Sequence, residues 1–188
     1  MTARLEPIDR WSFSYDGDPK SAPRPRFVMG KGKRKPRTYN DPAYTALKAQ
    51  IVAHMRMQPR PLWAGPDVPL VAVVRLVQPR TQDLRPRRLS DGTMSRPAED
   101  RWATVHGQPV EALLGEIPAH SSAADVDNLA KTPLDAMTQA GVIDDDHLIS
   151  GLWVSKHRAA MGERPRTDVT IYRWWQVGTL IEQLLEEL

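Results

Sequence analysis

Hydrophobic residues fall into short periodic runs, and the period of each run predicts a secondary-structure element. Aromatic residues alternate with polar ones over residues 11–15, which predicts a half-buried strand. Apolar residues then recur at helical spacing over residues 44–57. Asn40 or Asp41 is placed to cap this helix, and Pro42 suits its first turn. The first part of the chain is therefore predicted to be a strand, a loop and a helix.

A second helix is predicted in the later half of the chain. Its apolar stripe begins at Leu129, with Asp127 or Asn128 as the natural N-cap, and Gly141 marks its end. Pro133 is tolerated only in a first turn, because proline lacks the backbone N–H of an interior position. The pattern therefore predicts that this helix begins near Leu129.

The remaining segments complete an α+β domain over residues 1–188. The valine-rich run 68–79 predicts a buried strand. After the second helix, a turn into a strand is expected over 144–159 and another strand over 167–174. Residues 80–122 show little periodicity and are interpreted as an insertion. The last residues, about 175–188, predict an amphipathic C-terminal helix. Strands and helices in this order favour one α+β domain.

Composition restricts the classes of protein to which the chain can belong. Its 188 residues are 40% hydrophobic, which is enough for a packed core. The absence of cysteine excludes disulfides, thiolate metal sites and cysteine nucleophiles. No apolar run resembles a signal peptide or approaches the length of a membrane span, so we expect a cytoplasmic protein without a membrane partner.

Positive charge is concentrated in one proline- and glycine-rich segment, which we call the basic arm (Pro19–Tyr39). It carries eight lysines or arginines and no acidic residue, and its proline and glycine content excludes a regular helix. Such a cluster favours contact with the phosphates of a nucleic acid, although a solvated loop is the alternative. The residues expected to bind DNA are Arg24, Arg26, Lys31, Lys33, Arg34, Lys35 and Arg37.

Negative charge is concentrated further along the chain. Asp125 and Asp127 are two residues apart, Lys131 follows Asp127 by one helical turn, and a run of aspartates occupies residues 144–146. These acids form one site only if the strand after the helix returns the run to the first pair. An all-carboxylate ligand set without histidine or cysteine favours Mg²⁺, with Mn²⁺ as a possible substitute. Helix caps and solvated acids are the alternative interpretation.

The segment 125–146, DVDNLAKTPLDAMTQAGVIDDD, resembles the signature of the RusA-type Holliday-junction resolvases in residue type and spacing. PRPRF at 23–27, the Arg37-x-Tyr39 before the first helix and the valine-rich strand are also similar to the family. The insertion at 80–122 departs from it. The resemblance implies a small mixed sheet with flanking helices. It also implies a Mg²⁺-dependent endonuclease, a homodimer that resolves four-way junction DNA in a bacterial or phage-infected cell.

The resemblance also assigns roles to individual residues. The family's essential carboxylates correspond to Asp125, Asp127 and Asp146, and its essential lysine to Lys131. Asp145 matches the first member of the family's aspartate pair and is a further metal ligand. Asp144 has no counterpart in the family pattern, so the family's aspartate pair could also align one residue earlier in the run. Asp135 has a supporting or structural role.

Two other functions are compatible with these residues. One is a metal nuclease of broader branched-DNA specificity, and the other is a non-catalytic protein that binds DNA junctions. His147 is interpreted as a solvated turn residue, with contact to a scissile phosphate as the alternative. For the Trp174–Trp175 pair, a core or dimer-interface role is favoured over base stacking.

Overall fold

The fold was analysed in a computed structural model of the chain. The residues described are 10–22, 26–28, 37–39, 41–61, 65–80, 90–91, 115–119, 125–160 and 162–177, with backbone alone for 26–28 and 37–39. No helix within these ranges is both long and apolar enough to cross a membrane.

A mixed five-stranded sheet forms the centre of the molecule. Its strands, in spatial order, are β1 (Arg10–Asp16), β7 (Arg166–Arg173), β4 (Leu70–Gln78), β6 (Ile149–Arg158) and β5 (Ile117–Pro118). β4 lies parallel to β6 and antiparallel to β7, and β1 is antiparallel to β7. The valine-rich run is thus a central strand, as its composition predicts, and the small mixed sheet confirms the α+β expectation.

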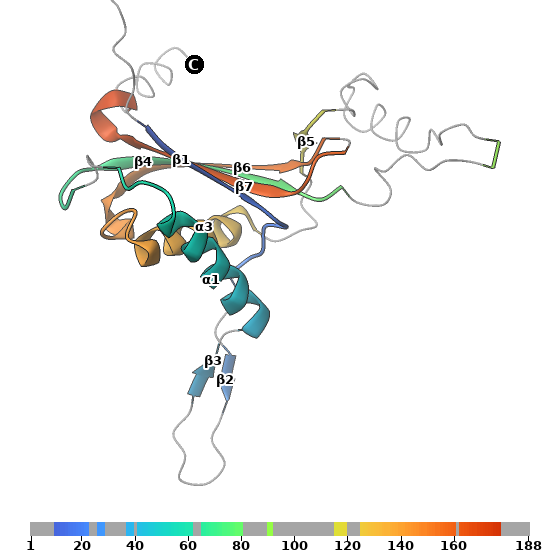
Figure 1. The fold of residues 1–188 in the computed structure, drawn as a ribbon, viewed down its shortest axis with the longest axis horizontal. Coiled ribbons are helices and arrows are strands. Elements are labelled where there is room, and N and C mark those ends of the chain that lie inside the picture. The colour runs from blue at the N-terminus through green and yellow to red at the C-terminus, as the bar shows by residue number, and fades with distance from the viewer. Residues whose placement is uncertain are drawn as a thin grey trace, which may run out of the picture.

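Two helices cover one face of this sheet (Figure 1). α1 (Pro42–Arg56) packs against β1 and α3, and α3 (Val126–Ala140) packs against β4 and β6. Their apolar side chains form one core with the sheet. Its most deeply buried large residues include Met55, Leu70, Leu76, Leu129, Met137, Ile143 and Ile171.

α3 is the crossover between the parallel strands β4 and β6. A parallel pair requires the chain to return to the end of the sheet from which it started. α3 therefore runs antiparallel to both strands, and its last residue is followed by a turn, the short 3₁₀ helix η3 (Asp146–Leu148) and the first residue of β6. The start of α3 lies at the opposite end of the sheet from η3 (Figure 1).

The basic arm contains two short strands that the sequence pattern did not reveal. β2 (Arg26–Val28) and β3 (Arg37–Tyr39) pair antiparallel, separate from the main sheet, and stand beyond the start of α1 (Figure 1). Three residues per strand are too few for alternation to be recognised in the sequence.

The predicted start of the second helix is wrong by three residues. Asp125 is the N-cap of α3, so Asp127 and Asn128 lie within its first turn and Pro133 lies in the helix interior. Proline at this position removes one hydrogen bond of the helix. Pro133 is buried and lines a hollow together with Leu47, and this tertiary packing offsets the loss.

The other predicted boundaries agree with the structure where it describes them. Asp41 caps α1, accepting hydrogen bonds from the backbone N–H of Ala43 and Tyr44, and Pro42 is the first helical residue. Most of the expected insertion lies outside the described residues, although β5 falls within it. Residues 174–177 begin a helix, and the rest of the expected C-terminal helix lies outside the described part of the chain.

Gly141 ends α3 in the left-handed conformation, with φ of 71°, and its N–H is bonded to the Thr138 carbonyl at 3.0 Å. A Cβ at this position would also collide with the Arg60 guanidinium. We expect Gly141→Ala to lower the free energy of unfolding by about 1–2 kcal/mol, measured by urea denaturation. Gly65→Ala is the control, because its φ is ordinary and its nearest neighbour would be Val68 at 3.9 Å. Equal stabilities for the two variants would contradict this account.

Candidate active site

Asp125 occupies the N-cap position of α3 without using its side chain as a cap. Its backbone is extended, with φ of −57° and ψ of 144°, and its carbonyl accepts the hydrogen bond of the Leu129 N–H at 3.0 Å. No side-chain capping bond is present, whereas the Asp41 carboxylate of α1 accepts a bond from the Ala43 N–H at 2.7 Å. The exposed Asp125 carboxylate is therefore available to a ligand.

Asp127 and Lys131 lie on one exposed side of the first two turns of α3. Residues four apart in a helix are neighbours on its surface, so the carboxylate and the ammonium share a face. Neither side chain hydrogen-bonds or ion-pairs with any residue that the structure describes, and both are exposed.

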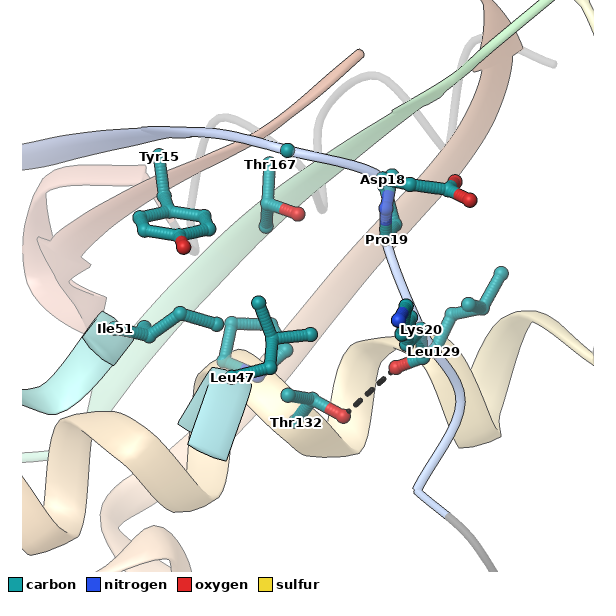
Figure 2. Close-up of a pocket in the computed structure, with 11 residues that line it drawn as sticks. Tyr15, Asp18, Pro19, Lys20, Leu47, Ile51, Leu129, Thr132 and Thr167 are labelled. Atoms are coloured by element: carbon teal, nitrogen blue, oxygen red, sulfur yellow. Dashed lines mark hydrogen bonds between the residues drawn. The ribbon is translucent and has the colours of Figure 1, made fainter. Parts of the chain in front are cut away.

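The loop after β1 fixes the start of α3. The Ala22 N–H donates to the Asn128 carbonyl at 3.0 Å, and the Thr132 hydroxyl donates to the Lys20 carbonyl at 3.0 Å (Figure 2). Beside this contact lies a cavity of about 10 Å³, lined mainly by apolar side chains and large enough for one water molecule. It is too small for a substrate, and the contacts around it position the helix.

Asp18 and Lys20 are two charged residues near the start of α3 that the sequence pattern did not single out. Desolvation raises the pKa of the Asp18 carboxyl, and the positive charges of Lys20 and Arg158 oppose the rise. Nothing in the spacing of Asp18 and Lys20 in the sequence relates them to Asp125. Only the folded loop brings them to the same end of the sheet.

Asp135 connects the two helices. Its carboxylate accepts a hydrogen bond from the Lys48 ammonium at 3.1 Å, and both side chains are partly buried between α1 and α3. This contact agrees with a structural role for Asp135, because its charge is already paired within the protein.

The aspartate run lies at the other end of α3. Asp145 caps η3, accepting a hydrogen bond from the His147 N–H at 3.1 Å, and its carboxylate also lies 3.0 Å from the His147 Nδ1. These bonds, with the Asp146 side chain, lower the pKa of Asp145 to about 2. Asp145 thus remains ionised at neutral pH. Asp144, Asp146 and His147 are exposed to solvent beside it.

The expected metal ligands therefore form two pairs, which we call the helix-start pair (Asp125 and Asp127) and the turn pair (Asp145 and Asp146). α3 has 15 residues, so it separates the two pairs by roughly 22 Å. Within the described ranges of one chain, no three acidic or histidine side chains come together as a metal site would require. Each pair alone supplies too few protein ligands for the predicted three-carboxylate site.

The predicted DNA-binding residues are only partly described. Arg26 begins β2 and Arg37 begins β3, so both lie on the hairpin beyond α1. Arg24, Lys31, Lys33, Arg34 and Lys35 lie outside the described residues.

A family model described as "Endodeoxyribonuclease RusA" matches residues 16–172 of the chain. The match includes strands β4, β5 and β6 and nearly all of β7, both helices and the two aspartate pairs. Among curated proteins, none matches this sequence.

The different N-caps of α1 and α3, Asp41 and Asp125, lead to a prediction about stability. We expect Asp41→Ala to lower the free energy of unfolding by about 1 kcal/mol, because two N–H groups lose their acceptor. Asp125→Ala should cost less, because only the attraction between its charge and the helix N-terminus is lost. Urea denaturation of both variants measures the difference. An equal or larger loss for Asp125→Ala would assign that carboxylate a capping role.

Proposed function

The chain belongs to the RusA endodeoxyribonuclease family, and we propose that it is a Mg²⁺-dependent endonuclease that resolves four-way DNA junctions by paired, symmetric nicks. The observation that carries this proposal is the exposed arrangement of Asp125, Asp127 and Lys131 at the start of α3, where none of these side chains is paired with another residue that the structure describes. Asp135, by contrast, is partly buried between the helices and is paired with Lys48. Exposed carboxylates grouped on a rigid helix are suited to binding a cation instead.

The chemistry of the acids favours a hard cation. Aspartate oxygens are the ligands preferred by Mg²⁺ and Mn²⁺, and the bound ion would neutralise negative charge at the phosphate that is cleaved. Within the described part of one chain the predicted ligands do not form a complete three-carboxylate site, because the helix-start pair and the turn pair lie at opposite ends of α3.

Lys131 would act on the DNA directly. Its ammonium lies one turn from Asp127 on the same exposed face, where it can donate hydrogen bonds to a phosphate oxygen and stabilise the charge that develops during cleavage. It would also reduce the repulsion between Asp127 and an approaching phosphate.

The basic arm and the symmetry of the substrate complete the proposal. The eight lysines and arginines of the basic arm suit the phosphate backbone of a DNA arm, whatever its sequence. A four-way junction has two-fold symmetry, so two paired nicks are best made by a homodimer with two equivalent sites.

The assignment of Asp127 as a metal ligand is tested by replacing its carboxylate with an amide. We expect Asp127→Asn to fold and to bind a synthetic four-way junction as the native protein does, but to cleave it at least about 100-fold more slowly in Mg²⁺, because an amide is a poorer ligand for a hard cation. Asp67→Asn is the matched control. Asp67 lies in a turn outside α3 and has φ of 72°, a conformation that asparagine adopts readily. Cleavage by Asp127→Asn at the native rate would overturn the assignment.

The activity itself is tested on DNA of several shapes. Native protein should cut a mobile four-way junction in preference to forks, flaps and linear duplex, and chelation of Mg²⁺ should abolish cutting. Equal cutting of all branched substrates would favour the broader nuclease, whereas junction binding without cutting would favour a non-catalytic role.

The basic arm makes a separate prediction about binding. Neutralising Lys31, Lys33, Arg34 and Lys35 together should weaken DNA binding for every sequence. It should also reduce the slope of log K against log salt by up to about 0.9 for each phosphate contact that is lost. Fluorescence anisotropy at several salt concentrations measures this slope. An unchanged slope would identify these four residues as part of a solvated loop.

A further inference from the structure

The loop that follows β1 is held in place at both of its ends. At its start, the Gly17 N–H donates to the carbonyl of Pro165, the residue immediately before β7, at 2.8 Å. At its end, the Ala22 N–H donates to the Asn128 carbonyl of α3 at 3.0 Å. Pro19 between them is buried, and its ring fixes one of its backbone angles. We call residues 17–22 the anchored loop.

The anchored loop is bonded to α3 beside two of its predicted functional residues. One bond is made to Asn128, which follows Asp127 in the chain. The other joins the Lys20 carbonyl to the hydroxyl of Thr132, and Thr132 follows Lys131 (Figure 2). Asn128 and Thr132 are four residues apart, so they form a stripe along the helix surface next to the stripe of Asp127 and Lys131. The anchored loop therefore flanks the exposed acid and ammonium.

Lys20 brings a cation to this surface. Its carbonyl is fixed by the bond to Thr132, whereas its side chain is exposed. Burial raises the pKa of the nearby Asp18 carboxyl, and the positive charge of Lys20 opposes the rise. Beyond this, the Lys20 ammonium forms no hydrogen bond or ion pair with any residue in the described ranges. Lys20 thus has a fixed backbone and a charged end that is available to a ligand.

The charges at the start of α3 indicate which ligand suits Lys20. The helix-start pair is negative and repels a DNA strand, and Lys131 lies on the same stripe as Asp127. DNA carries a phosphate at every nucleotide, so a strand whose cleaved phosphate lies at this stripe places further phosphates beside it. A second cation on the flank of the stripe would bind one of these phosphates and offset the repulsion.

From these contacts we infer that Lys20 binds a phosphate next to the one that is cleaved, and that the Thr132 hydroxyl positions Lys20 by holding the anchored loop on α3. The inference rests on the proposed function and deepens it. It adds one residue that touches the substrate, Lys20, and one positioning residue, Thr132, which acts through the loop.

Lys20 differs from the other cations of the basic arm in how it is placed. Arg26 and Arg37 lie on the β2–β3 hairpin, which pairs separately from the main sheet. Lys20 lies instead on a loop with two hydrogen bonds to the helix that carries Asp127. A cation fixed relative to the reacting groups aligns the strand for cleavage, so its loss should lower the cleavage rate more than the affinity.

The rate at saturation tests Lys20. With protein in excess over an end-labelled four-way junction, Lys20→Gln should lower the maximal cleavage rate by about tenfold and the affinity by less than about threefold. Lys20→Arg keeps the charge and should retain at least about half of the native rate. Arg10→Gln is the control, because Arg10 is an exposed cation at the other end of β1 from the loop. Cleavage by Lys20→Gln at the native maximal rate would overturn the inference.

The contact is located independently from the side of the DNA. Junctions are prepared with a neutral methylphosphonate in place of one phosphate, at each position near the cut in turn. At one position the native protein should slow by about tenfold, whereas Lys20→Gln should cut modified and unmodified DNA equally, because it has already lost that contact. If every methylphosphonate slows native protein and Lys20→Gln by the same factor, Lys20 does not bind a phosphate near the cut.

A double-mutant cycle tests the positioning role of Thr132. Thr132 is buried, and Thr132→Val removes the hydroxyl that holds the Lys20 carbonyl, so cleavage should slow while Thr132→Ser stays close to native. Combined with Lys20→Gln, Thr132→Val should cause no further loss, because both changes act on one contact. Thr170→Val on β7 is the control for the loss of a strand hydroxyl. Additive losses would show that Thr132 does not act through Lys20.

These outcomes are distinguishable from a failure of the proposed function. If native protein does not cut the junction in Mg²⁺, the proposed function is wrong and the inference falls with it. If native protein and Lys20→Gln cut at equal rates, the nuclease assignment stands and the inference alone is wrong. If urea denaturation shows that Thr132→Val is unfolded, the Lys20 variants and the methylphosphonates still decide, because Lys20 is exposed and its substitution leaves the core intact.

Discussion

The parallel pairing of β4 with β6 is the constraint on which the rest of the molecule depends. Parallel neighbours cannot be joined by a tight turn, so the chain must cross the sheet, and α3 is that crossover. The length of α3 then determines where its flanking residues lie. The Asp125–Asp127 segment is placed at one end of the sheet and the Asp144–Asp146 run at the other, although only 16 residues lie between Asp127 and Asp144.

Several contacts hold α3 in one orientation on the sheet. The Lys48–Asp135 ion pair joins it to α1, the Thr132 hydroxyl joins it to the loop after β1, and Gly141 ends it. Each contact uses a residue on the buried or half-buried side of the helix. The opposite, exposed side of α3 carries Asp127 and Lys131, which form no ion pair or hydrogen bond with any other residue that the structure describes. This arrangement is expected where a rigid helix supports a binding surface.

Much of this fold follows from local sequence. Alternation at Trp11 and Phe13, the valine content of β4 and the Asp41–Pro42 cap each determine an element by short-range chemistry alone. The start of α3 was not predictable in this way, because the burial of Pro133 against other elements overrides its usual preference for a first turn. The aspartates were identified by their spacing, but their distance apart depends on the path of the chain through the whole sheet.

The central position of β4 has a consequence for the order in which the chain can fold. Val74 of β4 pairs with Val154 of β6 and with Val169 of β7, so both neighbours of the strand come from segments that follow it at long range in the sequence. Such non-local pairs form slowly, because a long loop must close before they gain any contact. During synthesis the valine-rich strand therefore leaves the ribosome before either of its neighbours exists, and its apolar side chains stay unpaired until both have been made.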